Sequence, residues 1–269
     1  MSAPVIQYNY LEDYLDKVRS MGRFAFTWTE IKAQFEISDK ALNQSLYRLK
    51  VKKKIAQVRK GFYAIITPEY SNYGIPPPVL YIDDLMNSLN KKYYVGLLSA
   101  AALYGAAHQQ PMEFFVITEK PALRNIKSKK VKINFYVKKQ WAKEDIIQKK
   151  TDAGYINVSS PELTALDLLF YQDSFGINKV VTVLHELASE MKALNLTKTA
   201  KTYSQVAAMQ RLGYLLDNEL RNEKLSGALW VVLKQKTLFP VPLSTTKLKE
   251  GSTDDKWKVI RNMKIESDI

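Results

Sequence analysis

The stretch from Thr27 to Ile66 constrains the fold of this chain more tightly than any other part of it. Thr27 and Glu30 have the spacing of a capping box, in which the side chain of each residue accepts a hydrogen bond from the backbone N–H of the other. A short helix is therefore predicted to begin directly after Thr27, with Ile31 and Phe35 on its apolar face.

A second helix is predicted from Asp39 to Lys50, with Ser38 as its N-cap. Leu42, Leu46 and Leu49 recur at the spacing of one helical face and are expected to point into a core. The residues expected on the outward face or its flank are Lys40, Asn43, Gln44, Tyr47 and Arg48. Amide, phenol and cationic groups are the side chains that can hydrogen-bond to base edges in a major groove.

A β-hairpin is predicted next, with strands at Ile55–Val58 and Phe62–Ile66. The turn Arg59-Lys60-Gly61 joins them, and its glycine can adopt a backbone conformation that other residues resist. An amphipathic helix from Leu11 to Met21 is expected to pack behind these elements. Three helices followed by a hairpin are the elements of a winged helix-turn-helix domain, in which the hairpin is the wing.

Between Lys40 and Pro68 the sequence has eight cations and no carboxylate. Cations placed along a DNA duplex release the counterions held by its phosphates, and this release favours binding. The alternative is a solvated basic face on an ordinary helical domain. Because the helix order, the outward amides and the basic hairpin tip coincide, we predict binding to double-stranded DNA. The predicted DNA-binding residues are Lys40, Asn43, Gln44, Tyr47, Arg48, Lys52, Lys53, Arg59 and Lys60.

The length of 269 residues favours two domains, and the net charge of +13 favours an anionic partner. From Pro68 to Pro78 several prolines and a glycine disfavour helix and strand, so a domain boundary is expected there. The predicted division is a winged helix domain at residues 1–75 and a C-terminal domain at residues 76–269. The predicted fold class is α+β, and the second domain is expected to be a larger mixed α/β domain with a small sheet and several helices.

The second domain is expected to contain a buried helix at Gly96–Ala107, because this stretch is apolar on nearly every face. The strands predicted after it are Phe114–Thr118, Val131–Val137 and Tyr155–Val158. Further helices are predicted at Leu80–Leu89, Pro161–Tyr171, Lys179–Leu194, Tyr203–Leu216 and Lys224–Lys236, and a closing strand at Trp257–Arg261. In the second strand, Lys132 and Lys138 are expected on an exposed face opposite Ile133 and Phe135.

Four stretches of sequence resemble the AbiEi family of antitoxins. They are YYVGLLSAAALYGAAHQQP at Tyr93–Pro111, SSPELTALDLLFY at Ser159–Tyr171, QRLGYLLD at Gln210–Asp217 and RKGFYAI at Arg59–Ile65. The resemblance implies a transcriptional autorepressor that binds its own operator. It also implies that the C-terminal domain counteracts a cognate nucleotidyltransferase toxin, AbiEii, in abortive infection against phage. Basic winged-helix residues carry over onto Lys40, Arg48, Arg59 and Lys60, and no catalytic residues carry over.

A second basic region lies between Lys120 and Lys150, where the sequence has eleven cations and only two carboxylates. The patch is predicted to consist of Arg124, Lys127, Lys129, Lys130, Lys132 and Lys138. It is a solubilising surface, a second nucleic-acid contact with flanking operator DNA or with RNA, or a contact with an acidic patch of the toxin. The sequence leaves these three alternatives open.

Catalysis is not expected. His108 and His185 have no partner at metal-ligand spacing, and no phosphate-binding glycine loop is present. The stretch from Gly251 to Asp255 resembles the glycine-serine-to-aspartate motif of nucleotidyltransferases only faintly, because a tryptophan follows where a second aspartate is needed. The absence of cysteine excludes disulfides and thiolate metal sites. We therefore expect a protein that is not an enzyme and has no metal and no cofactor.

The longest apolar run, Val95–Ala107, is too short to cross a bilayer, and the first ten residues have no signal-peptide pattern. The expected location is the cytoplasm, without membrane contact. The oligomeric state is not fixed by these patterns. A second function class also stays open, namely a winged-helix regulator that senses a small ligand, such as a nucleotide, in a pocket beside the buried helix.

Overall fold

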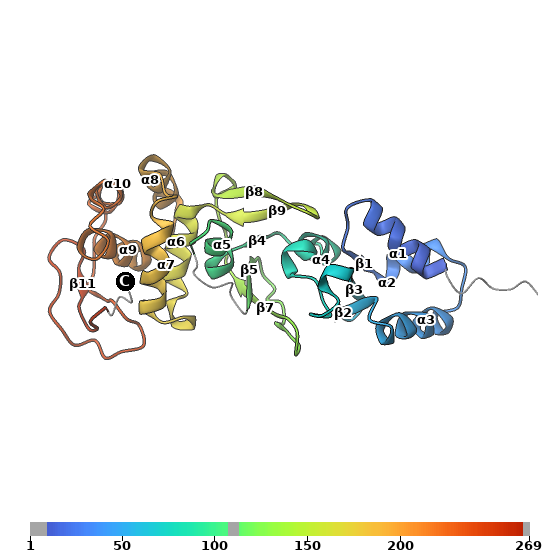
Figure 1. Ribbon diagram of the computed structural model, residues 1–269. Coiled ribbons are helices and arrows are strands. Elements are labelled where there is room, and N and C mark those ends of the chain that lie inside the picture. Colours follow the sequence, from blue (N-terminus) through green and yellow to red (C-terminus); the bar gives the residue numbers. More distant parts are fainter. Residues whose placement is uncertain (1–9, 107–112, 266–269) are drawn as a thin grey trace, which may run out of the picture. The chain divides into compact units, whose positions relative to one another are not determined.

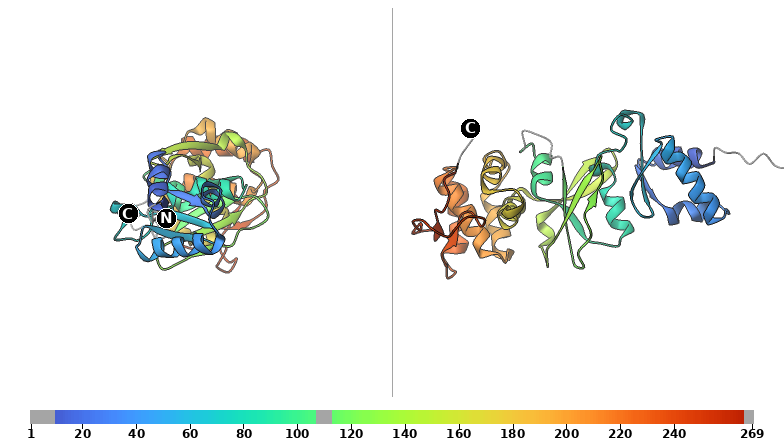
Figure 2. Two further views of the ribbon diagram at one scale, coloured as in Figure 1. Left: turned by 90° about the vertical axis from the view of Figure 1, so that its right-hand side faces the viewer. Right: turned by 90° about the horizontal axis from the view of Figure 1, so that it is seen from below.

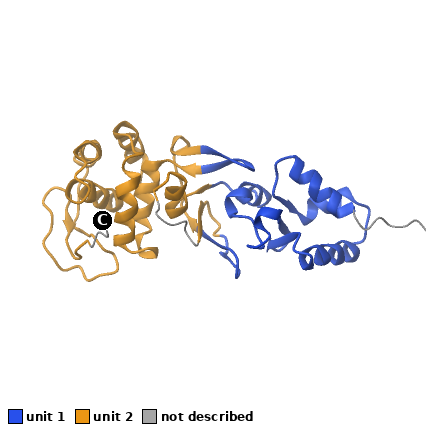
Figure 3. Cartoon of the chain, in the orientation of Figure 1, with its two compact units in different colours: residues 1–93, 123–135, 148–157 blue, residues 94–122, 136–147, 158–269 orange. Residues whose placement is uncertain are grey.

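The computed structural model describes residues 10–106 and 113–265. They fall into two compact units (Figure 3). Unit 1 comprises residues 1–93, 123–135 and 148–157, and unit 2 comprises residues 94–122, 136–147 and 158–269. The division predicted between residues 75 and 76 stays a prediction.

Unit 1 begins with three helices and a three-stranded antiparallel sheet (Figure 1). In chain order these elements are α1 (Tyr10–Ser20), β1 (Ala25–Thr27), α2 (Trp28–Gln34), α3 (Asp39–Val51), β2 (Ile55–Arg59) and β3 (Phe62–Ile65). The strand order is β1-β3-β2, and both strand pairs are antiparallel. This order of elements is the one expected for a winged helix-turn-helix domain with the β2–β3 hairpin as its wing. The α+β fold class predicted from the sequence is confirmed.

Local capping starts the two helices of the helix-turn-helix. The Thr27 hydroxyl accepts from the Glu30 N–H at 3.0 Å, and the Glu30 carboxylate accepts from the Thr27 N–H at 2.6 Å. The Ser38 hydroxyl accepts from the Ala41 N–H at 3.2 Å. Partial burial alone would raise the pKa of Glu30, but the Thr27 N–H and the Arg23 guanidinium outweigh it and hold the pKa below its usual value. The predicted capping box is present.

The core of this domain gathers apolar faces from its helices and strands. Leu42, Leu46 and Leu49 of α3 are buried, and they belong to one cluster with Leu11 and Leu15 of α1. Fully burying one leucine side chain stabilises the folded state by about 1.5–3 kcal/mol. This burial fixes α3 in rotation, so its opposite face points to solvent.

The chain then continues through 3₁₀ turns and one helix. These elements are η1 (Pro68–Tyr70), η2 (Pro78–Leu80) and α4 (Ile82–Ser88). Asp84 of α4 pairs with Arg23 at 3.3 Å, and the ring of Tyr81 lies 6.4 Å from that of Phe62 between centroids. These contacts connect α4 to the winged helix domain within unit 1.

The largest sheet has six strands in the order β6-β7-β5-β4-β9-β8. Their bounds are β4 (Tyr93–Val95), β5 (Phe114–Thr118), β6 (Ile126–Lys127), β7 (Lys132–Val137), β8 (Ile146–Thr151) and β9 (Gly154–Ser159). Val95 of β4 lies opposite Val158 of β9 in a parallel pair, and Ile126 lies opposite Ile133 in an antiparallel pair. The predicted strands correspond to β5, β7 and β9, whereas β4, β6 and β8 were not predicted.

The described residues of unit 2 contain six α-helices (Figures 1 and 2). They are α5 (Leu97–Leu103), α6 (Pro161–Phe170), α7 (Ile177–Leu187), α8 (Ala193–Thr202), α9 (Val206–Asn218) and α10 (Glu223–Leu233), with 3₁₀ turns η3 (Lys143–Asp145) and η4 (Gln172–Ser174). Helix α6 is buried along all of its residues except Phe170. None of the helices in the described residues is long and apolar enough to cross a membrane.

The helices predicted at Gly96–Ala107 and at Lys179–Leu194 differ from the structure. Helix α5 stops at Leu103, because Gly105 takes a positive φ of 78° and the chain turns; Ala107 lies outside the described residues. The helix predicted at Lys179–Leu194 is wrong as one element, since α7 ends at Leu187 and α8 begins six residues later. Between them the backbone N–H of Lys192 donates to the buried Glu162 carboxylate at 2.8 Å, so it is not used by a continuing helix.

The C-terminal segment of unit 2 contains a pair of parallel strands, β10 (Val241–Pro242) and β11 (Val259–Ile260). The predicted closing strand at Trp257–Arg261 is thus present in a shorter form. Trp257 is fully buried, and its ring occupies the space where Gly213 of α9 has no side chain.

Candidate nucleic-acid interface

The outward face of α3 is exposed as the sequence predicted. Lys40, Asn43, Gln44, Tyr47 and Arg48 are all exposed, and 62% of the Tyr47 surface is accessible although it is a large aromatic residue. An exposed phenol beside amides and cations matches the chemistry of groove recognition. Binding by these residues stays a prediction.

Asn43 and Gln44 differ in how far they are available to a ligand. The Asn43 carbonyl oxygen accepts a hydrogen bond from Trp28 Nε1 at 3.0 Å. Bidentate recognition of adenine needs both the oxygen and the nitrogen of an amide, and the bond to Trp28 already uses one of the two lone pairs of the Asn43 oxygen and restrains its side chain. Gln44 is therefore the better placed amide for base recognition.

The wing tip is held against the start of α2. Gly61 has a φ of +76°, and its carbonyl accepts a hydrogen bond from the Trp28 N–H at 2.8 Å. Lys60 is exposed in this turn, and Arg59 beside it is half-buried. Lys60 thus lies in a turn of fixed geometry, and Arg59 is the last residue of the strand before it.

The linker between α3 and the wing adds further cations. Lys52 and Lys53 are exposed, and Lys52 pairs with Glu12 of α1 at 3.1 Å. Lys50 donates to the Gln57 side chain at 3.2 Å. An exposed ion pair contributes about 0–1 kcal/mol, so Lys52 can exchange Glu12 for a phosphate at small cost.

The second basic patch is only partly as predicted. Arg124, Lys127, Lys129 and Lys130 are exposed, and Lys132 is half-buried. Lys138, which was expected on the same exposed face, instead forms an ion pair with Asp167 of α6 and keeps only 10% of its side chain exposed. The prediction for Lys138 is wrong because α6 covers this face of the sheet there: Tyr136 packs on Tyr171, with ring centroids 4.9 Å apart. Lys138 is removed from the patch.

Asp167 is the centre of a buried polar cluster that sequence reasoning missed. Its carboxylate, fully buried, accepts from Lys138 Nζ at 2.6 Å, from the Tyr94 hydroxyl at 2.7 Å and from the Tyr203 hydroxyl at 2.8 Å. Burial, together with the nearby Asp167 charge, raises the pKa of Tyr94 and of Tyr203 well above the usual value. The one indication in the sequence is an aspartate among leucines of an apolar helix, which requires a partner.

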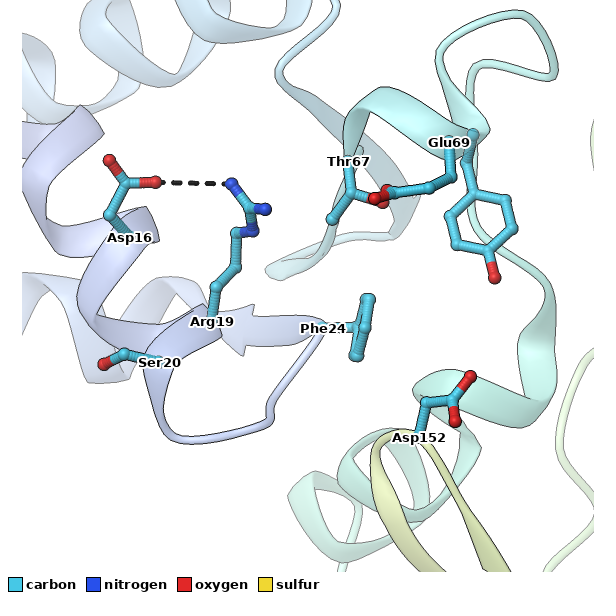
Figure 4. A pocket seen from close by; sticks show the side chains of 8 residues that line it. Asp16, Arg19, Ser20, Phe24, Thr67, Glu69 and Asp152 are labelled. Atoms are coloured by element: carbon cyan, nitrogen blue, oxygen red, sulfur yellow. Dashed lines mark hydrogen bonds and ion pairs between the residues drawn. The ribbon is translucent and has the colours of Figure 1, made fainter.

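A cavity of about 600 Å³ in unit 1 is acidic (Figure 4). Asp16, Glu69 and Asp152 contribute three carboxylates to its lining, and Arg19 contributes one cation, which pairs with Asp16 at 3.4 Å. Carboxylates repel phosphate groups, so this cavity does not suit a nucleotide. This cavity lies in unit 1. A small-ligand pocket beside the buried helix would lie next to α5, which belongs to unit 2.

Asp254 and His185, two residues that could have served in catalysis, lie in the described part of the chain. The Asp254 carboxylate accepts from the backbone N–H groups of Lys256 and Trp257 and pairs with Arg261 at 3.2 Å, so it shapes a turn. His185 is half-buried on α7. His108 lies outside the described residues.

Known proteins resemble this chain in its fold and, over one segment, in its sequence. A solved structure, that of the RV2827C protein from Mycobacterium tuberculosis, has a similar fold with a TM-score of 0.66; the match covers 96% of this chain and 92% of that one at 16% sequence identity. No curated protein matches. Residues 94–218 match the family model of the AbiEi antitoxin C-terminal domain. Over this segment the chain is similar to the C-terminal domain of AbiEi antitoxins. The AbiEi match supports an antitoxin role in a toxin–antitoxin system, as the sequence resemblance implied.

Proposed function

We propose that the protein is a transcriptional autorepressor and antitoxin, which binds double-stranded operator DNA and counteracts a cognate nucleotidyltransferase toxin in bacterial defence against phage. The observation that carries the DNA-binding half is the outward face of α3, where amide, phenol and cationic groups are exposed opposite a buried leucine stripe. The match to the AbiEi antitoxin C-terminal domain supports the antitoxin half.

In this proposal α3 enters the major groove. Gln44 and Tyr47 meet base edges there, because recognition helices of helix-turn-helix proteins present such side chains to the groove. Arg59 and Lys60 of the wing meet phosphates, which fix position on the duplex without reading its sequence. The two groups of residues therefore have separable effects on affinity and on sequence choice.

The variant Arg59→Ala/Lys60→Ala is expected to bind every duplex more weakly, because it loses two phosphate contacts. The slope of log affinity against log salt should become shallower by about 2, and affinity should fall by roughly tenfold or more near 0.1 M salt. Fluorescence anisotropy with the protein's own upstream DNA and with an unrelated duplex measures both quantities.

The matched control is Gln44→Ala, which removes a base contact and no charge. It should leave the salt slope unchanged and reduce the preference for the operator over the unrelated duplex by about 1–3 kcal/mol. If the wing variant instead kept full affinity and slope, the wing would not contact DNA.

The antitoxin half is tested in cells that express the toxin encoded beside this gene. Because the proposal assigns protection to the C-terminal domain, the wing variant should restore growth as well as the unchanged protein while failing to repress the promoter. Loss of protection in the wing variant, at equal protein level, would show that the two functions are not separable.

A further inference from the structure

Two basic regions that are far apart in the sequence line one cavity in unit 1. Lys50 and Lys53 come from the end of α3 and the linker after it, and Lys129 and Lys130 come from the turn between β6 and β7. The cavity has a volume of about 320 Å³, and no carboxylate is among the described residues that line it. We call it the lysine cavity.

The β6–β7 turn presents its lysines from a fixed backbone. The Ser128 hydroxyl accepts from the backbone N–H of Lys130 at 3.2 Å and of Val131 at 3.0 Å, which closes the turn. The Lys130 amine lies against Gly74, and a side chain at Gly74 would collide with it. A turn ordered before binding loses less conformational entropy when it meets a ligand.

The charge of the lysine cavity selects the ligand class. Four ammonium groups without a carboxylate favour an anion, in contrast to the acidic cavity of Figure 4 in the same unit. Gln57, to which Lys50 donates at 3.2 Å, adds a neutral amide to the lining. Phosphate groups, which accept several hydrogen bonds from ammonium and amide donors, fit this lining.

We propose that the lysine cavity binds a backbone phosphate of the same DNA duplex that α3 and the wing hold. This inference rests on the proposed function. The cavity begins at the C-terminal end of α3, and when the N-terminal part of a recognition helix reads the groove, its other end lies near the sugar-phosphate backbone. The β6–β7 turn thereby becomes a phosphate clamp outside the helix-turn-helix, and of the three alternatives for the second basic patch, flanking operator DNA is the one selected.

The test compares the variant Lys129→Ala/Lys130→Ala with the unchanged protein on operator DNA and on an unrelated duplex. The expected result is a salt slope shallower by about 2 and an affinity lower by roughly tenfold or more near 0.1 M salt, equally for both duplexes. The matched control is Lys234→Ala/Lys236→Ala, which removes two exposed lysines of unit 2 and should leave the slope unchanged. Lys129→Arg/Lys130→Arg, which keeps the charges, should keep the affinity.

An unchanged salt slope in the Lys129/Lys130 variant, together with normal binding by the unchanged protein and weakened binding by the wing variant, would overturn the inference and leave the proposed function intact. If the unchanged protein bound no duplex, the proposed function itself would fail. Two further arms separate the sources of phosphate. If the Lys129/Lys130 variant lost binding to RNA but kept its binding to DNA, the assignment to DNA would be overturned. The same holds if inorganic phosphate stabilised the unchanged protein but not the variant, while the salt slope of the variant on DNA stayed normal.

Discussion

Replacing Asp167 with alanine is expected to lower the free energy of unfolding of unit 2 by about 3–5 kcal/mol. The substitution leaves the Lys138 ammonium almost buried without its counter-charge, and it removes the acceptor of the Tyr94 and Tyr203 hydroxyls. Breaking a buried ion pair costs more than the pair contributes, because one charge stays in a medium that solvates it poorly. Urea unfolding followed by circular dichroism measures the change.

Three controls separate the charge from the hydrogen bonds. Asp167→Asn keeps an acceptor for a tyrosine hydroxyl but not the charge, so it should fall between the unchanged protein and the alanine variant. Tyr203→Phe removes one hydrogen bond and should cost about 1 kcal/mol. Asp255→Ala, at an exposed aspartate, should stay within about 0.5 kcal/mol of the unchanged protein. Equal stability of the Asp167→Ala and Asp255→Ala variants would contradict the structural role of the cluster.

Replacing Trp257 with alanine is the second substitution with a large expected effect, about 3–5 kcal/mol of unfolding free energy. Its ring is fully buried, lies 5.3 Å from the ring of Trp230 between centroids, and donates through Nε1 to Asp217 at 2.9 Å. The alanine variant leaves a cavity beside α9 and an acceptor without this donor. The same urea unfolding experiment measures the loss.

Substitutions at Gly213 test the packing of Trp257 independently, because the Trp257 ring occupies the space where Gly213 has no side chain. In the unchanged protein Gly213→Ala should destabilise by about 1–3 kcal/mol, since the ring must move in a packed core. In the Trp257→Ala background the same change should be neutral or stabilising by up to about 1 kcal/mol, because alanine favours helix over glycine. Equal effects of Gly213→Ala in both backgrounds would show that the two residues do not share this space.

The winged helix domain could be predicted from the sequence because its determinants are local. The capping box at Thr27, the N-cap at Ser38 and the leucine stripe of α3 each involve residues within one or two helical turns, and all are present in the structure. The exposure of Gln44 and Tyr47 follows directly from that stripe. What the pattern could not show is that Asn43 is already bonded to Trp28, a contact between two helices.

Non-local contacts account for what sequence reasoning missed. Lys138 alternates with apolar residues as an exposed lysine would, and only the position of α6 shows that it meets Asp167. Between α7 and α8 the N–H of Lys192 donates to Glu162, which lies thirty residues upstream. The lysine cavity likewise joins Lys50 and Lys130, which no periodicity connects. Hydrophobic periodicity and secondary-structure propensity describe a single segment, whereas these three contacts depend on residues that are distant in sequence and close in space.

Binding of the full chain to its own upstream DNA is the most direct test of the central claim, that α3 and the wing hold a duplex. Gel shifts and anisotropy should be recorded from low to physiological salt, with an unrelated duplex of equal length in parallel. The account predicts a steep loss of affinity with salt and an affinity for the upstream region at least about 10³ times that for the unrelated duplex. No shift at low salt, or the same affinity for both duplexes, would contradict it.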